Sequence, residues 1–317
     1  FMSLGQQTIG IDQIELIFVD DASTDEDATW NMLQEFERAY PESIMILKLE
    51  ENMRQGGARN VALQYATGEY IAFVDADDFV SENFLLETYE KAKESDADII
   101  QFEYFYYTDR LGAVDSGRNI TPEVIEISSV SDRKRFLISE KVTYGCWNKL
   151  YRHTLLNEAH TAYAEHVIYE EPLFVYPLLY FANKIVILND AYYYYRQNDS
   201  GTMRNDMRQE ETLKMHADVQ LAVWNFMKKT PFFKEYYDEI KLYFLHTYLY
   251  ETLYFAKLRD FKPSYAFYKE LEKTVITEVP DYEESTYSAL IPKQMELYRM
   301  IEEGMTEEKF GGYCERL

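Results

Sequence analysis

The sequence predicts an α/β fold, in which a mostly parallel, doubly wound sheet is followed by a helical region. In residues 14–106, short apolar runs rich in strand-forming residues alternate with segments of helical length. This alternation is typical of parallel sheets with crossover helices. Beyond about residue 205 the apolar residues recur with a helical period. We therefore expect one domain over residues 1–204 and a helical domain over residues 205–317.

The first half of the chain supplies the expected sheet. Residues 1–12 read as the tail of a helix and a loop, so we expect the chain to start inside the fold, after a first strand. The strands that follow are short apolar runs, expected at Ile14–Val19, Ile44–Leu49, Tyr70–Val74 and Ile99–Tyr106. The helices between them are expected at residues 27–40, 58–65 and 82–95.

The regular alternation of strands and helices ends after residue 107. We expect a helix over residues 128–139, a buried helix at Leu173–Phe181, and two strands, Ile185–Leu188 and Tyr192–Tyr195. The C-terminal helices are expected near residues 209–228, 233–258, 265–274 and 286–301, with prolines between them or in their first turns.

Composition limits the classes of partner. The 317 residues carry a formal net charge of -24, which disfavours nucleic acid and anionic lipid as direct ligands. Cys146 and Cys314 lie far apart in sequence, which favours a reducing, cytoplasmic compartment. No run of 18 apolar residues indicates a membrane span. Attachment to the inner face of a membrane through a partner, and homo-oligomer formation, stay open.

Three carboxylates follow the strand Tyr70–Val74, namely Asp75, Asp77 and Asp78. Carboxylates at the end of a buried strand are costly unless a positive charge lies nearby. A hard divalent cation that also binds phosphate oxygens would supply that charge. Ligands of open α/β sheets bind outside the carboxyl ends of the strands, so we expect a metal–diphosphate site here. The alternative is an acidic turn with a helix cap near Ser81.

Further polar motifs follow other predicted elements. Asp20, Asp21 and Ser23 come directly after the strand Ile14–Val19, and a two-glycine loop precedes Arg59 in the first turn of a helix. Glu170 and Glu171 precede Pro172 at the start of the helix that includes Leu173–Phe181.

Together these motifs resemble the family-two glycosyltransferases of the bacterial polysaccharide-synthesis type. Val19–Asp25 resembles their Asp-Asp-Gly-Ser-Thr-Asp motif, and Asp75–Asp78 is similar to their Asp-x-Asp metal motif. Three more segments resemble recurring family segments: Asn52 with Gly57–Asn60 (Asn-x-Gly…Ala-Arg-Asn), Trp147–Tyr151, and Tyr194–Arg196 with Ser200. The resemblance covers roughly residues 3–204. It implies the GT-A fold, a nucleotide-sugar donor, a UDP-sugar above all, and transfer with inversion.

The resemblance also implies roles for individual residues. Asp77 would bind a Mn²⁺ or Mg²⁺ ion, with Asp75 near the metal or the ribose. The other donor-binding residues would be Asp20, Asp21, Ser23, Arg59, Ala76 and Arg196. Alternatives stay open, since Asp20 and Asp21 could cap a helix, Arg59 could form a structural salt bridge, and Arg196 could be a surface residue on a strand end.

The family uses the Asp of a Glu-Asp pair at a helix start as the catalytic base. Here the corresponding pair is Glu170–Glu171, so Glu171 would be the base with Glu170 beside it. This departs from the family by one methylene and by the following Pro172, which a first helical turn accepts. Both glutamates could instead be favourable helix N-terminal charges, and His166 is a rival base.

We therefore expect a cytoplasmic, metal-dependent, inverting glycosyltransferase that acts on a hydroxyl of a glycan or lipid-linked acceptor in cell-surface polysaccharide synthesis. Trp147 would then stack on an acceptor sugar or lie in the core. The alternative from another class is a non-catalytic, nucleotide-sugar-binding or assembly module. A nucleotidyltransferase is a second rival, because it also uses strand-end carboxylates and a metal.

Overall fold

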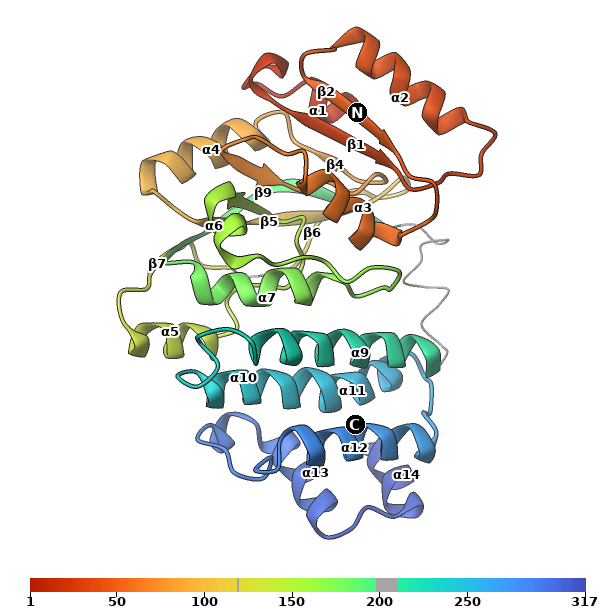
Figure 1. The fold of residues 1–317 in the computed structure, drawn as a ribbon, viewed down its shortest axis with the longest axis vertical. Helices are drawn as coiled ribbons and strands as arrows, with labels where there is room; N and C mark the ends of the chain where they lie inside the picture. The colour runs from red at the N-terminus through yellow and green to blue at the C-terminus, as the bar shows by residue number, and fades with distance from the viewer. Residues whose placement is uncertain (119, 198–209) are drawn as a thin grey trace. The chain divides into compact units, whose positions relative to one another are not determined.

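The computed structural model describes residues 1–118, 120–197 and 210–317. It divides into two compact units, Phe1–Asn198 and Asp199–Leu317, drawn as a ribbon in Figure 1. The first unit holds every strand of the described residues, and the second is helical. The predicted boundary between residues 204 and 205 lies outside the described residues.

The first unit contains two sheets. One consists of two parallel strands, β1 (Leu16–Asp20) and β2 (Ile44–Lys48). The other has seven strands, and its main path runs β3 (Tyr70–Ala72), β8 (Lys149–Arg152), β5 (Ile99–Thr108), β9 (Lys184–Arg196) and β4 (Phe79–Val80). Strand β6 (Gly112–Asp115) pairs with β5, and β7 (Glu123–Glu126) pairs with β9.

The α/β fold class is confirmed, but the larger sheet is mixed rather than mostly parallel. Within it, β5 and β9 are parallel, while the other described pairs are antiparallel. The reason is β8, which comes from the second half of the unit and lies between β3 and β5, antiparallel to both. The two strands expected at 185–188 and 192–195 are one continuous strand, β9, and its pairing with β5 has register shifts.

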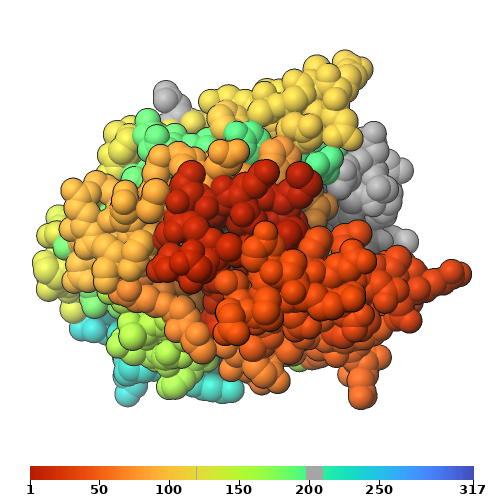
Figure 2. Space-filling view, turned by 90° about the horizontal axis from the view of Figure 1, so that it is seen from above, coloured from red at the N-terminus to blue at the C-terminus, as the bar shows by residue number. Residues whose placement is uncertain are grey.

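Helices pack against these sheets. They are α1 (Met2–Gly5), α2 (Ala28–Ala39), α3 (Arg54–Leu63), α4 (Phe84–Ser95), α5 (Val130–Leu137), α6 (His153–Ala159) and α7 (Glu171–Phe181), with a 3-10 turn at Ile11–Gln13. A core cluster that includes Phe84, Ile100, Phe102 and Tyr193 joins α4 to the middle of the larger sheet. In the view of Figure 2, segments from the N-terminal part of the chain, coloured red to orange, form much of the visible face.

The second unit confirms the predicted helical region. It contains α9 (Glu210–Met227), α10 (Tyr237–Phe244), α11 (Thr252–Leu258), α12 (Tyr265–Glu278), α13 (Pro292–Glu302) and α14 (Glu307–Arg316), with a 3-10 turn at Ser288–Leu290. The helix expected over 233–258 begins at Tyr237, and a π-helical segment, Leu245–Glu251, joins α10 to α11. Among the described residues, no helix is both long enough and apolar enough to cross a membrane.

Candidate active site

The acidic turn after β3 is hydrogen bonded to β9. The Tyr193 hydroxyl donates to Asp78 Oδ2 at 2.7 Å and accepts from the Asp75 backbone N–H at 3.0 Å. The Arg196 backbone N–H donates to Asp78 Oδ1 at 2.7 Å. Burial raises the pKa of Asp78 to about 7, and the nearby charges of Asp75 and Asp77 add to that effect. The turn therefore concentrates negative charge at the end of β3.

Arg59 connects this turn to the start of α7. Its Nη2 lies 2.6 Å from Asp75 Oδ1, and its Nη1 lies 2.5 Å from Glu170 Oε1. The guanidinium also lies over the Tyr163 ring, 5.2 Å from its centroid. Arg59 thus forms the salt bridge that was one alternative, while its contact with a diphosphate stays a prediction. The pair with Glu170 joins residues 111 positions apart in the sequence.

Glycine allows α3 to deliver Arg59 to this position. A Cβ atom on Gly56 would lie 2.0 Å from the backbone oxygen of Ala164 and 3.1 Å from Cβ of Glu170. Real side chains do not approach this closely, so Gly56 permits a contact between α3 and the loop before α7 that no larger residue would.

Glu170 and Glu171 have different surroundings. Glu170 is 3% exposed and pairs with Arg59. Glu171 is only partly buried, and its Oε1 accepts a hydrogen bond from the Cys146 backbone N–H at 2.7 Å. Burial raises the pKa of Glu171, as does the charge of Glu170, while Arg59 opposes the shift. Pro172 lies in the first turn of α7, which accommodates it. Glu171 thus has the chemistry of a general base.

Asp20 and Asp21 stabilise the loops at the end of β1. Asp20 Oδ1 accepts from the Ser23 backbone N–H at 2.9 Å, whereas its buried Oδ2 has no hydrogen-bond partner. Asp21 Oδ1 accepts from the Met53 backbone N–H at 2.7 Å. Neither residue caps α2, whose N-cap residue is Asp27. A buried carboxylate oxygen without a partner is a place where a ligand N–H group would fit.

Asp75 and Asp77 have the donor chemistry that a hard divalent cation requires. Mg²⁺ is commonly bound by one or two carboxylates together with substrate phosphates, so these two side chains suffice on the protein's side. Within the described ranges, no three or more His, Cys, Asp or Glu side chains are grouped to hold a metal without further ligands. A cation at this turn would therefore have to share its ligands with a diphosphate, and its binding stays a prediction. Ala76 lies between the two aspartates.

Arg196 lies beside the acidic turn. Its Nε donates to the Asp77 backbone oxygen at 3.0 Å, and its Nη1 pairs with Asp109 Oδ1 at 2.9 Å. The guanidinium also lies over the Tyr107 ring, 5.2 Å from its centroid. Arg196 therefore supports the turn, and its predicted contact with a diphosphate stays untested. Ser200, part of the same motif, lies outside the described residues. His166, the rival base, is exposed.

Comparison with known proteins places these motifs in one family. Residues 2–159 match the model of the family described as Glycosyl transferase family 2. The chain belongs to this family. Its acidic turn, Arg59 and the strand that ends at Asp20 all lie within the matched residues, whereas Glu170 and Glu171 lie beyond them.

Relatives of this family 2 chain include bacterial glycosyltransferases. Glycosyltransferase GlyG of Streptococcus pneumoniae is 31% identical over 61% of this chain and 64% of its own length. The poly(ribitol-phosphate) beta-N-acetylglucosaminyltransferase TarS of Staphylococcus aureus is 28% identical over 63% of this chain and 33% of its own length. The matches thus span less than two thirds of either relative. A crystal structure of S. aureus TarS 1–349 in complex with UDP has a TM-score of 0.67 at 20% identity, and covers 99% of this chain and 83% of that one. This likeness shows a shared fold.

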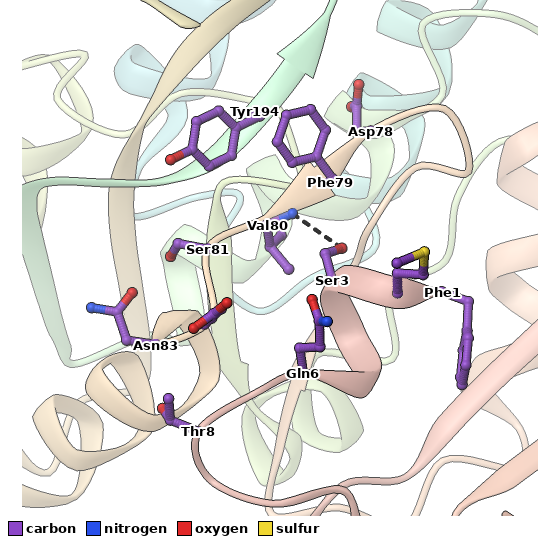
Figure 3. A pocket seen from close by; sticks show the side chains of 12 residues that line it. Phe1, Ser3, Gln6, Thr8, Asp78, Phe79, Val80, Ser81, Asn83 and Tyr194 are labelled. Atoms are coloured by element: carbon purple, nitrogen blue, oxygen red, sulfur yellow. Dashed lines mark hydrogen bonds between the residues drawn. The ribbon is translucent and has the colours of Figure 1, made fainter.

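A cavity of about 850 Å³ lies beside the site (Figure 3). It lies between the N-terminal segment that contains Ser3 and the segment Asp78–Asn83, with Tyr194 beside Phe79. Asp78 lines it, whereas Asp75 and Glu171 do not. The cavity therefore adjoins the acidic turn but not the proposed base.

Sequence reasoning missed two residues of this family 2 site. Tyr193, which hydrogen bonds the acidic turn, lies within four consecutive tyrosines, and only the alternation of side chains along a strand could have singled it out. Lys149 is fully buried and donates to Gly145 O, Thr143 Oγ1 and Asn148 Oδ1, so it stabilises the loop whose Cys146 N–H contacts Glu171. Burial lowers the pKa of Lys149 to about 7.

Proposed function

We propose that this family 2 chain transfers a sugar from a UDP-sugar to a hydroxyl of a glycan or lipid-linked acceptor, with inversion, during the synthesis of a cell-surface polysaccharide. Two relatives are named as transferases that add a sugar to poly(ribitol-phosphate). TarS structures that share this fold are described in complex with UDP or UDP-GlcNAc. The identities of the donor and the acceptor of this chain are part of the proposal.

The observation that carries the proposal is the double ion pair of Arg59. It brings the acidic turn and the Glu170–Glu171 pair together, although they come from distant segments. A sugar bound between them would have its leaving diphosphate near Asp75 and Asp77, and its acceptor face toward Glu171. Inverting transfer requires these two sides, because the acceptor attacks opposite the leaving group.

Glu171 is the proposed base. Its carboxylate would take the proton of the acceptor hydroxyl as the acceptor oxygen forms a bond to the anomeric carbon of the donor sugar. The bond from that carbon to the diphosphate oxygen breaks, and UDP leaves with the electron pair. The Cys146 N–H fixes one carboxylate oxygen at 2.7 Å, which orients the base. Its raised pKa makes Glu171 a stronger base than an ordinary glutamate.

The other residues would bind the donor. Asp77, with Asp75, would hold a divalent cation, and such an ion stabilises negative charge on a departing diphosphate. Asp20 would accept a hydrogen bond from an N–H group of the nucleotide base through its Oδ2, which has no partner in the protein. Ser23, Asp21 and Ala76 would line the donor site, with Arg59 and Arg196 as the cations nearest to the turn among the predicted set.

Calorimetric titration of UDP with and without Mn²⁺ tests the donor site. We expect binding that requires metal in the wild type and is lost in Asp77→Ala. The exposed Asp12 offers a matched control, since Asp12→Ala removes a carboxylate elsewhere and should leave binding unchanged. Absence of binding by any nucleoside diphosphate in the wild type would contradict the proposal.

Release of UDP from a panel of UDP-sugars, with acceptor glycans present, tests the reaction itself. We expect turnover in the wild type and about 10²–10⁴-fold slower turnover in Glu171→Gln. Donor binding without turnover with any acceptor would instead favour the non-catalytic, assembly-module alternative.

A further inference from the structure

Aromatic rings line the proposed acceptor side of the site. β5 and β9 pair in parallel with Tyr104 beside Tyr193 and Tyr106 beside Tyr195. Because side chains alternate along strands, these four tyrosines share one face of the sheet. Trp147 joins them, since its ring stacks on Tyr195 with centroids 5.5 Å apart and an interplanar angle of 6°. We call Tyr104, Tyr106, Trp147 and Tyr195 the aromatic platform.

The rings of the platform contact one another continuously. The Tyr104 ring meets the Trp147 ring edge-on at 4.8 Å and the Tyr106 ring at 5.4 Å, and Tyr106 lies 6.1 Å from Tyr195. Tyr106 is 36% exposed, and the other three rings are half-buried. The other face of the same strands carries a separate group, in which Tyr194 stacks on Phe79.

Two contacts connect the platform to the proposed chemistry. Trp147 directly follows Cys146, whose N–H donates to Glu171 Oε1. Tyr193, on the same face, is hydrogen bonded to the acidic turn. Burial raises the pKa of Tyr195, and the charges of Asp78, Asp75, Asp77 and Glu171 add to the shift.

Charge around the platform disfavours an anionic acceptor. Among the described residues of the first unit, the cations near these rings already have partners. Arg118 pairs with Glu103 at 3.7 Å, Arg59 pairs with two carboxylates, and Lys149 is fully buried among neutral acceptors. Arg196 lies on the face that carries Tyr107, and it pairs with Asp109. The carboxylates beside the platform therefore outnumber its cations, and the whole chain carries -24.

We propose that this platform binds the acceptor through an uncharged sugar ring, and that phosphate-bearing acceptors are excluded by the carboxylates beside it. Tyr and Trp rings offer an apolar face for the C–H face of a sugar, and Tyr hydroxyls hydrogen bond its hydroxyl groups. This inference rests on the proposed function and names its acceptor class. It differs from the polymer that gives several relatives their names, poly(ribitol-phosphate).

Four probes separate ring stacking from charge in saturation-transfer NMR on the full chain with UDP and Mn²⁺ present. They are methyl β-glucoside, its 6-phosphate, ribitol and ribitol 5-phosphate, with methyl glycosides of galactose and N-acetylglucosamine as further rings. We expect a neutral glycoside to bind at least tenfold more tightly than its 6-phosphate. It should also bind at least tenfold more tightly than ribitol and ribitol 5-phosphate. Ribitol 5-phosphate binding as tightly as every neutral glycoside would overturn the proposal.

Variants of Tyr106 then locate the binding. We expect Tyr106→Leu to weaken binding of the neutral glycoside at least fivefold and Tyr106→Phe to weaken it less than twofold, with UDP affinity unchanged in both. Tyr65→Leu, which removes an exposed tyrosine elsewhere, is the control. An unchanged glycoside affinity in Tyr106→Leu overturns the platform. If UDP binds but no glycoside does, this inference fails while the donor site stands. If UDP does not bind either, the proposed function fails as well.

Discussion

Removal of the Arg59 guanidinium is the perturbation whose effect the structure defines best. In Arg59→Met, the Glu170 carboxylate, whose side chain is 4% exposed, loses its ion-pair partner. The Asp75 side chain is 20% exposed and keeps access to water. The two carboxylates should therefore respond differently, and Glu170 should account for most of the loss of stability.

The expected magnitude follows from the burial of this pair. Removing one partner of a buried ion pair costs about 3–5 kcal/mol, because an uncompensated charge stays in the interior. Whole domains have free energies of unfolding of about 5–15 kcal/mol, so Arg59→Met should destabilise the first unit severely. Replacing both partners, in Arg59→Met with Glu170→Gln, removes that charge. We expect the double variant to be about 2 kcal/mol more stable than Arg59→Met alone.

Native-state hydrogen exchange, followed by mass spectrometry on peptides of α3 and α7, measures this unit by itself. Arg38→Met, which removes an exposed arginine of α2, is the control. A double variant as unstable as the sum of its single changes would refute the reasoning.

Four further predictions concern single positions. Glu171→Gln should lower kcat by about 10²–10⁴-fold with UDP affinity unchanged. In the wild type, kcat should fall as the pH falls, with an apparent pKa above 4.5, because burial raises the pKa of Glu171 and the base acts when deprotonated. An apparent pKa of 4.5 in the pH–rate profile would contradict this. Arg54→Gly should stabilise the fold by about 1 kcal/mol in thermal denaturation, because Arg54 has a φ of 59°, whereas Gln55→Gly in the same helix should destabilise it. Gly56→Ala should destabilise the first unit by more than about 1 kcal/mol, since its Cβ would overlap a backbone oxygen, and a neutral result in urea denaturation would refute that account. His216→Gln should make the second unit less sensitive to acid. Burial lowers the pKa of His216 to about 3, from 6.5, so the stability that the neutral imidazole contributes is lost as the pH falls below 6.5. Melting curves at a series of pH values would measure how steeply stability depends on pH.

Several strands and helices of the first unit were predictable because each depends on neighbouring residues. Apolar runs and their bounding polar residues placed β1, β2, β5 and α4 within a few residues of their observed ends. The pairing of strands was not predictable in this way. β8 begins 77 residues after β3 ends, yet it inserts between β3 and β5, and no local pattern reports such an insertion. The mixed sheet is therefore where the sequence-based prediction was wrong.

The candidate site shows the same difference between local motifs, which were predictable, and contacts between distant segments, which were not. The acidic turn and the Glu170–Glu171 pair were recognisable as short motifs, because strand and helix ends have local signatures. Their connection through Arg59 was not, since it depends on α3 packing closely at Gly56. Residues that act through a single backbone contact, such as Cys146, have no sequence signature at all. The roles in substrate binding stay predictions until the titrations are made.

The tyrosine run Tyr192–Tyr195 explains how Asp78 can be held in place without a further positive charge. A lysine or arginine bound directly to Asp78 would add a second positive charge to a turn whose Asp75 already pairs with Arg59, and would compete with the cation that we propose for Asp75 and Asp77. The Tyr193 hydroxyl and the Arg196 backbone N–H instead satisfy Asp78 with neutral donors. These neutral hydrogen bonds fix the geometry of the turn and add no positive charge to it. The abundance of tyrosine on this strand is thus consistent with a site that binds a cation between the carboxylates of the turn and a diphosphate.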